Sequence, residues 1–196
     1  MLAQSPVRSS SSIAPARRSA VEIYRHHRLV AGQKADGFSA VSYAGKILTF
    51  SSSGAVAHEA LDDLRTQIDS EFARLSSQRL DGLPTADELA LALALVGPKI
   101  PQSMQHLLEI MDEFGEVHVQ QLLRRSGVSE EALLRDLVRL ARACANALDI
   151  KLAKGAANAS AAVDLIAGHV EVAEPLPDIW LFRTAFAQAA ARHLAR

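Results

Sequence analysis

The segment that follows Gly127 constrains the fold more than any other part of this sequence. Glycine readily takes a positive φ at a tight corner, and Ser129 is a good helix N-cap because its hydroxyl accepts a backbone N–H. At about 100° per residue, one side of the next helix collects apolar side chains. These are Leu133, Leu137, Leu140, Cys144 and Leu148. The pattern predicts a sharp bend followed by a long amphipathic helix with a core-facing side.

The opposite side of this predicted helix carries three arginines, Arg135, Arg139 and Arg142, which lie about 180° to 240° from the first leucine. Arg124 and Arg125 precede the bend. Guanidinium groups bind phosphates and the edges of guanine, so this face is a candidate surface for double-stranded DNA.

Two acidic residues, Glu130 and Glu131, open the same helix and would repel phosphate. Negative charge in a first turn also stabilises a helix, and Glu131 has the i,i+4 spacing for an ion pair with Arg135. A solvent-exposed, salt-paired helix therefore remains an alternative to a DNA-reading one.

The corner resembles the helix-turn-helix family, whose members commonly show Gly-Val-Ser, two variable residues, a small residue and an aliphatic one. The matching residues here are Gly127, Val128, Ser129, Glu130, Glu131, Ala132 and Leu133. The match covers about 24 residues, and with the flanking elements residues 101–183 resemble a winged helix. This resemblance implies DNA contact by Arg124, Arg125, Ser129 and the arginine row, although such folds also serve as protein-docking modules.

Residues 21–50 are rich in β-branched and aromatic residues and are interrupted by glycines, which predicts three short antiparallel strands. A helix follows, which we expect Ser53 to cap. Its apolar residues recur at spacings of three and four. They are Ala57, Leu61, Leu64, Ile68, Phe72 and Leu75. Residues 21–79 are thus predicted to form a β-β-β-α unit.

A polar linker at residues 80–84 separates this unit from the C-terminal domain, residues 85–196. Thr85 and Glu88 form a capping box for a helix that ends at Gly97-Pro98. The next helix begins at Pro101 and stops near Gly115. We expect its inner face to consist of Met104, Leu107, Leu108 and Met111.

After the arginine-bearing helix, we expect a small-residue loop at Ala153–Ala162 and two strands, Val163–Val172 and Ile179–Phe182. Trp180 is expected in the core. Thr184 is expected to cap a last helix. Its small-residue face carries Phe186, Ala189, Ala190 and Leu194 and would suit packing on the domain or on a second copy, as in a symmetric dimer.

Charge is concentrated at the start of the chain. Residues 1–50 hold seven Lys or Arg and two Asp or Glu, whereas the whole chain has a net charge of −1. Residues 1–20 are predicted to be a flexible basic arm whose Arg17 and Arg18 follow a phosphate backbone. A solubilising tail and an organellar transit peptide are the alternatives.

Other features argue against an enzyme, a membrane protein or a metal protein. The single cysteine excludes an internal disulfide, and no apolar stretch approaches the ~18 residues that a bilayer requires. His58 and Asp62 share a helix face, but a third metal ligand of matching geometry is missing. No phosphate-binding glycine loop or nucleophile motif is present, so no cofactor is expected.

Together these features predict an α+β, helix-rich protein, with a β-β-β-α unit followed by a winged-helix-like domain. The composition is typical of a bacterial, cytoplasmic protein. We expect a non-enzymatic DNA-binding protein, such as a transcription regulator or accessory factor. The alternative is a protein–protein adaptor that uses the same fold for docking.

Overall fold

The computed structural model describes residues 19–97, 100, 102–114, 124–125, 127–152, 154, 157–170 and 179–195. It is a mixed α/β fold in which a four-stranded antiparallel sheet is followed by helices. The first part comprises β1 (Ala20–Tyr24), β2 (His27–Lys34), β3 (Gly37–Ala44), β4 (Ile47–Gly54) and α1 (Ala57–Ser76). The second part comprises α2 (Ala86–Val96), α3 (Gln102–Phe114), α5 (Glu130–Ala147), α6 (Ala157–Val163), β5 (Ala167–Val170), β6 (Ile179–Phe182) and α7 (Thr184–Leu194).

The first sheet has four strands in the order β1-β2-β3-β4, so the prediction of three strands was wrong. The additional hairpin turns at Arg25 and His26, which have φ of 41° and 63°. Two-residue hairpin turns with positive φ usually contain Gly, Asn or Asp, and the absence of these residues concealed the turn. The β3–β4 turn follows the usual rule, because Gly45 has a φ of 59°.

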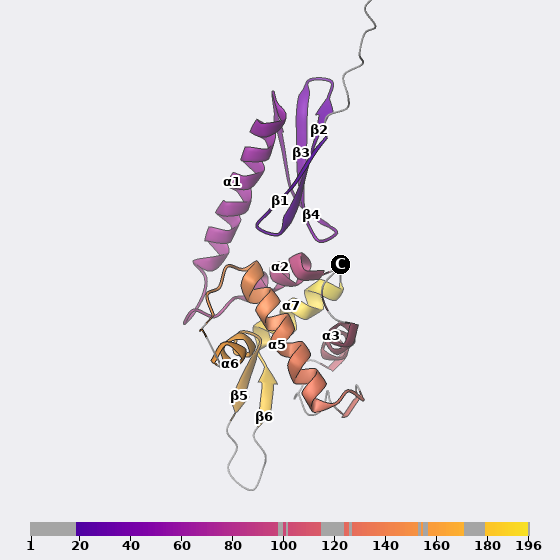
Figure 1. Ribbon diagram of the computed structural model, residues 1–196, viewed down its shortest axis with the longest axis vertical. Coiled ribbons are helices and arrows are strands. Elements are labelled where there is room, and N and C mark those ends of the chain that lie inside the picture. Colours follow the sequence, from indigo (N-terminus) through magenta and orange to yellow (C-terminus); the bar gives the residue numbers. More distant parts are fainter. Residues whose placement is uncertain are drawn as a thin grey trace, which may run out of the picture.

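One face of the sheet packs against α1, which runs along the strands in Figure 1. Cross-strand pairing puts Leu29, Ser42 and Phe50 on this face, and a bulge in β4 leaves Thr49 as the extra residue. Ser42 Oγ accepts the Phe50 N–H at 3.2 Å and lies 2.6 Å from Thr49 Oγ1. The buried serine therefore satisfies the polar groups that the bulge removes from the ladder.

Helix α1 buries the predicted stripe, with Ala60 in addition and Ala57 only partly buried. Its N-terminus does not use Ser53, because that residue pairs with Ser39 inside the ladder. Glu59 instead accepts the backbone N–H groups of Ala55 and Val56, at 3.0 and 3.4 Å. The predicted cap was wrong, because β4 extends further than expected and delays the start of the helix.

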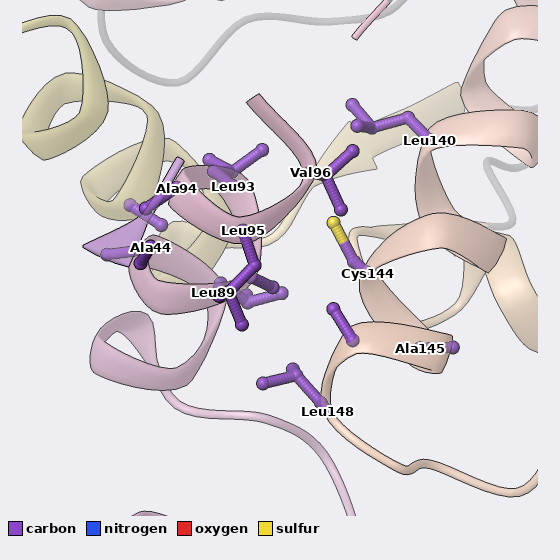
Figure 2. Close-up of a cluster of buried hydrophobic side chains, with 14 of the residues drawn as sticks. Ala44, Leu89, Leu93, Ala94, Leu95, Val96, Leu140, Cys144, Ala145 and Leu148 are labelled. Atoms are coloured by element: carbon purple, nitrogen blue, oxygen red, sulfur yellow. The ribbon is translucent and has the colours of Figure 1, made fainter. Parts of the chain in front are cut away.

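Helix α2 connects the sheet to the other helices. Its capping box is confirmed: Thr85 Oγ1 accepts the Glu88 N–H at 3.3 Å, and Glu88 Oε2 accepts the Thr85 N–H at 3.2 Å. It ends as predicted, with Gly97 as its C-cap. In Figure 2, Leu89, Leu95 and Val96 of α2 face α5, while Ala94 lies near Ala44 of β3. One buried cluster therefore extends from the sheet through α2 to α5.

The C-terminal elements differ from expectation in three places. The predicted loop at Ala153–Ala162 contains α6, in agreement with the high helix propensity of alanine. Strand β5 begins at Ala167, later than the predicted Val163, while β6 has the predicted bounds. Helix α7 has Arg183 and not Thr184 at its N-cap, because the Arg183 N–H is held by Ile166 O at 2.9 Å where β6 ends.

Helix α7 packs on α2 and α3. Its residues Phe186, Ala189 and Ala190 are fully buried, whereas Leu194 is 36% exposed. Met104 and Leu108 of α3 are buried as predicted. The small-residue face of α7 is therefore used within the molecule.

Candidate nucleic-acid interface

The corner before α5 has the predicted geometry. Gly127 has a φ of 65°, and Ser129 Oγ accepts the Ala132 N–H at 3.3 Å. Val128 is partly buried against the core. The hydroxyl of Ser129 is thus committed as an acceptor to its own helix, although its proton is still available to another acceptor.

The rotation of α5 about its axis is fixed by its buried side. Leu133, Leu137 and Leu140 are each 1% exposed, and Cys144 is fully buried. Burial raises the pKa of the Cys144 thiol to about 12, so this cysteine is a core residue with no thiolate at neutral pH. The leucine side predicted from the sequence is confirmed, and it turns the opposite side of α5 to solvent.

That outer side exposes the three predicted arginines, Arg135, Arg139 and Arg142. Together with Ala159 of α6 they border an open groove of about 530 Å³. The groove is lined by Leu134, Arg135, Val138, Arg139, Arg142 and Ala159. Guanidinium groups therefore lie beside a shallow apolar floor, an arrangement that suits an elongated anionic ligand.

One acidic residue, Asp136, lies beside the arginine row. It is on the same helix with its side chain 13% exposed, and its Oδ1 is 4.0 Å from Arg139 Nη1. Its other oxygen accepts a hydrogen bond from Ser103 Oγ of α3 at 2.6 Å. Within the described part of the chain, Arg135 forms no ion pair, and the expected pair with Glu131 is not formed.

Asp136 and α6 are the two features of this site that the sequence analysis missed. Asp136 was obscured by the stronger arginine pattern, although its i,i+3 spacing from Arg139 is visible in the sequence. The small residues of α6 are typical of a loop, and on that basis the sequence predicts one there. Its alanine content was the available signal.

The remaining predicted contact residues are only partly described. Arg124 and Arg125 are exposed and helical, directly before the corner. Arg17 and Arg18 lie outside the described residues, as do the three acidic residues between β5 and β6, Glu171, Glu174 and Asp178. Lys151 and Lys154, which follow α5, are exposed.

Part of the basic N-terminal segment is occupied by internal contacts. Arg25 Nε is 2.6 Å from Asp69 Oδ1 of α1, and the same guanidinium pairs with Asp149 after α5. The Arg28 guanidinium lies 4.9 Å from the centre of the Tyr43 ring. These two arginines therefore contribute to the fold, and the candidate interface is limited to α5 and its surroundings.

The other candidate site considered in the sequence, a metal site that would use His58 and Asp62, lies on the surface of α1. Asp62 pairs with Arg65, and Asp63 accepts a hydrogen bond from Gln67 at 2.8 Å. Across the described residues, no group of three or more His, Cys, Asp or Glu side chains is placed to hold a metal ion. No helix among them is long and apolar enough to cross a lipid bilayer.

Comparison of the chain with protein-family models, with curated proteins and with solved structures found no match. The geometry and charge of the interface are therefore the features that indicate a function.

Proposed function

We propose that this protein is a non-enzymatic, cytoplasmic DNA-binding protein that contacts the duplex with the outer side of α5. The observation that carries the proposal is the exposed row of Arg135, Arg139 and Arg142, opposite a buried leucine side that fixes its direction. Arginine suits phosphates and guanine edges, because its planar guanidinium group presents several donors in a fixed geometry and loses less side-chain entropy per hydrogen bond.

The order of elements supports a winged-helix arrangement in the second part. Helix α3, the corner at Gly127, α5 and the antiparallel β5–β6 pair follow one another as in that fold. The intervening α6 departs from the simplest winged helix and adds one wall to the groove beside the arginines. In this arrangement α5 is the recognition helix.

The test is binding of a labelled DNA duplex over a series of salt concentrations. Removing one arginine that binds a phosphate should reduce the slope of log K against log[salt] by about 0.9. The double variant Arg135→Ala/Arg139→Ala should therefore bind more weakly and show a slope smaller by about 1.8. Both residues are exposed, so the variant should keep its fold.

The control is the double variant Lys34→Ala/Arg74→Ala, which removes the same charge from exposed positions on β2 and α1. Its affinity and slope should stay close to those of the wild type. Equal losses in the two variants would mean that binding depends on net charge alone. Unchanged binding of the α5 variant would refute the proposed interface.

A protein–protein adaptor is the second candidate, and one observation favours it. The sheet face opposite α1 carries exposed apolar residues, with Val21, Ile23 and Leu48 exposed by 62%, 68% and 58%. Pairing joins Ile23 and Leu48 through Arg28 and Tyr43 in one row across the sheet. Apolar surface of this kind often marks an interface.

The two functions predict different sensitive surfaces. If the protein is an adaptor, Ile23→Thr/Leu48→Thr should abolish recovery of a defined partner, whereas Arg135→Ala/Arg139→Ala should leave that recovery unchanged. If it acts through DNA, Ile23→Thr/Leu48→Thr should bind the duplex as well as the wild type does, and only Arg135→Ala/Arg139→Ala should lose affinity.

A further inference from the structure

The face of the sheet that is turned away from α1, here called the outer face, is apolar in two adjoining rows. The first row crosses three strands through Val21, Val30 and Val41. The second is the row that leads from Ile23 to Leu48 across all four strands. Val21, Ile23 and Leu48 are each more than half exposed, so this apolar surface is open to a partner.

The two rows together have the outline of one helix. Neighbouring strands are about 4.8 Å apart, so a row across four strands is about 14 Å long, and the two rows lie about 7 Å apart. The next row along the strands consists of Gly32, Ser39 and Ser53 and is not apolar. A helix about 10 Å wide covers the two rows with about three turns, whereas a second sheet would need a larger apolar face.

A cation lies within the second row. Arg28 is paired with Ile23 on one side and with Tyr43 on the other. Its guanidinium group is 4.9 Å from the centre of the Tyr43 ring, and this cation–π contact holds the charge close to the outer face. A partner that covers the apolar rows therefore also covers Arg28.

The fold supplies no acid for this arginine. Within the described part of the chain, no carboxylate pairs with the Arg28 guanidinium. Among the residues of the four strands the one acid is Glu22, and its two oxygens accept hydrogen bonds from Arg65 of α1, on the other face, at 2.9 and 2.6 Å. Because an unpaired buried guanidinium is strongly unfavourable, the partner must bring a carboxylate to Arg28.

Two occupants from this chain lack that carboxylate. Alternation along β2 puts Lys34 on the same face as Arg28, so a second copy stacked face to face would present two basic residues and no acid. Residues 1–18 contain three arginines and no acid. Charge complementarity therefore favours a different protein as the occupant of the outer face.

We propose that the outer face of the sheet binds an amphipathic helix of another protein, whose apolar side carries one Asp or Glu that pairs with Arg28. The carboxylate can accept two parallel hydrogen bonds from the guanidinium group, which fixes the position of the helix on the face. Ile23 and Leu48 contact the apolar residues of the helix on either side. The proposal rests on the adaptor function given above and not on DNA binding by α5.

The probe is a phage-displayed library of helical peptides of three to four turns, selected on the immobilised full chain. One side of each peptide varies among Leu, Ile, Val, Phe, Glu, Gln and Lys, and the other side consists of good helix formers. We expect the enriched peptides to carry one Glu within an apolar side. The best peptide is then synthesised with a fluorescent label, and its affinity is measured by anisotropy. Replacing its Glu by Gln should weaken binding at least about tenfold, as the loss of a hydrogen bond between charged groups does.

The variant Arg28→Glu reverses the charge within the apolar rows. It should lose the Glu peptide and bind the version with Lys in its place. Lys34→Glu is the matched control, because it makes the same change of charge on the same strand and face but beyond the two rows, and it should keep the preference for Glu. Ile23→Thr/Leu48→Thr should lose every version of the peptide, which keeps the test informative if Arg28→Glu does not fold.

Four results would overturn the proposal. The first is that no enriched peptide depends on Ile23 and Leu48 for binding. The second is equal affinity of the wild type for the Glu, Gln and Lys peptides, which would leave the adaptor function standing without an acidic partner. The third is a dimer in sedimentation that Ile23→Thr/Leu48→Thr abolishes, which would assign the outer face to a second copy. The fourth is binding of labelled oligothymidine that Arg28→Glu abolishes, which would assign the face to single-stranded nucleic acid.

Discussion

At the scale of single residues, His27 shows how the fold changes the chemistry of a side chain. Burial lowers the pKa of its imidazole below the ordinary 6.5, and the nearby His26 lowers it further, against the opposing effect of the Arg25 carbonyl. The folded protein therefore holds His27 neutral at a pH at which the unfolded chain begins to bind a proton there.

This shift predicts a specific pH dependence of stability. Well above pH 6.5 both states are neutral at His27, and the free energy of unfolding does not depend on pH through this residue. As pH falls through 6.5 toward the lower folded pKa, the unfolded chain binds the extra proton, so the free energy of unfolding decreases, by at most about 1.4 kcal/mol per pH unit. Urea unfolding of the wild type between pH 7.5 and 5 measures the decrease.

The variant His27→Phe isolates the effect, because all other titrating groups remain. As pH falls through 6.5, its stability should fall less steeply than that of the wild type, and the two slopes should be equal well above that pH. Parallel curves throughout the range would contradict the assigned role of this histidine, whatever the absolute stability of the variant.

At the scale of elements, two glycine corners have the same backbone conformation but different surroundings. Gly45 between β3 and β4 has a φ of 59°, and Gly127 before α5 has a φ of 65°. A Cβ on Gly45 would lie 2.5 Å from the Ala94 carbonyl oxygen of α2, whereas a Cβ on Gly127 would meet no atom within 4 Å. The first corner is therefore also a contact between the sheet and α2.

Substitution by alanine separates these two contributions. Gly127→Ala should cost about 1 to 2 kcal/mol, the strain of a side chain at positive φ. Gly45→Ala should cost distinctly more, because the turn must also move away from α2. Chemical denaturation of both variants gives the comparison, and equal losses would mean that the sheet and α2 do not press together at this corner.

The elements also show where sequence patterns suffice and where they fail. The burial of Leu133, Leu137 and Leu140 was predicted correctly. Their spacing along the helix alone determines that they share one side, and this apolar side is the one that packs on the core. The turn at Arg25 and His26 was missed because its positive φ values are imposed by surrounding contacts, among them Asp69 and Asp149.

The arginine row and the hollow bordered by His27 differ in the same way. The direction of the α5 arginines follows from the leucine side of their own helix. That hollow, of about 380 Å³, joins residues from five elements, namely β2, β4, α1, α2 and α7, and no local pattern indicates that Phe50, Phe72 and Leu91 lie together. Long-range packing decides this arrangement, and it is invisible in any short stretch of sequence.

At the scale of the whole molecule, Arg79 links three segments that are distant in the chain. It follows α1, pairs with Glu88 of α2 at 2.6 Å, and donates to the carbonyl oxygen of Leu148 after α5 at 3.2 Å. The Glu88 side chain is only 2% exposed. This buried pair lies where the sheet unit, α2 and α5 converge, and the continuous core around it predicts that the two parts unfold together.

Removal of the arginine should therefore be costly. Arg79→Ala leaves the Glu88 carboxylate buried with the Thr85 N–H as its remaining partner, and the free energy of unfolding should fall by about 3 to 5 kcal/mol. Adding Glu88→Gln should recover part of this loss, because the amide carries no charge and still serves the capping box. Arg74→Ala, which breaks an exposed pair with Glu71 on α1, is the control and should cost far less. Denaturant unfolding followed by circular dichroism measures the wild type and the three variants. If Arg79→Ala lowers the free energy of unfolding no more than Arg74→Ala does, the buried Arg79–Glu88 pair contributes little to the stability of the molecule.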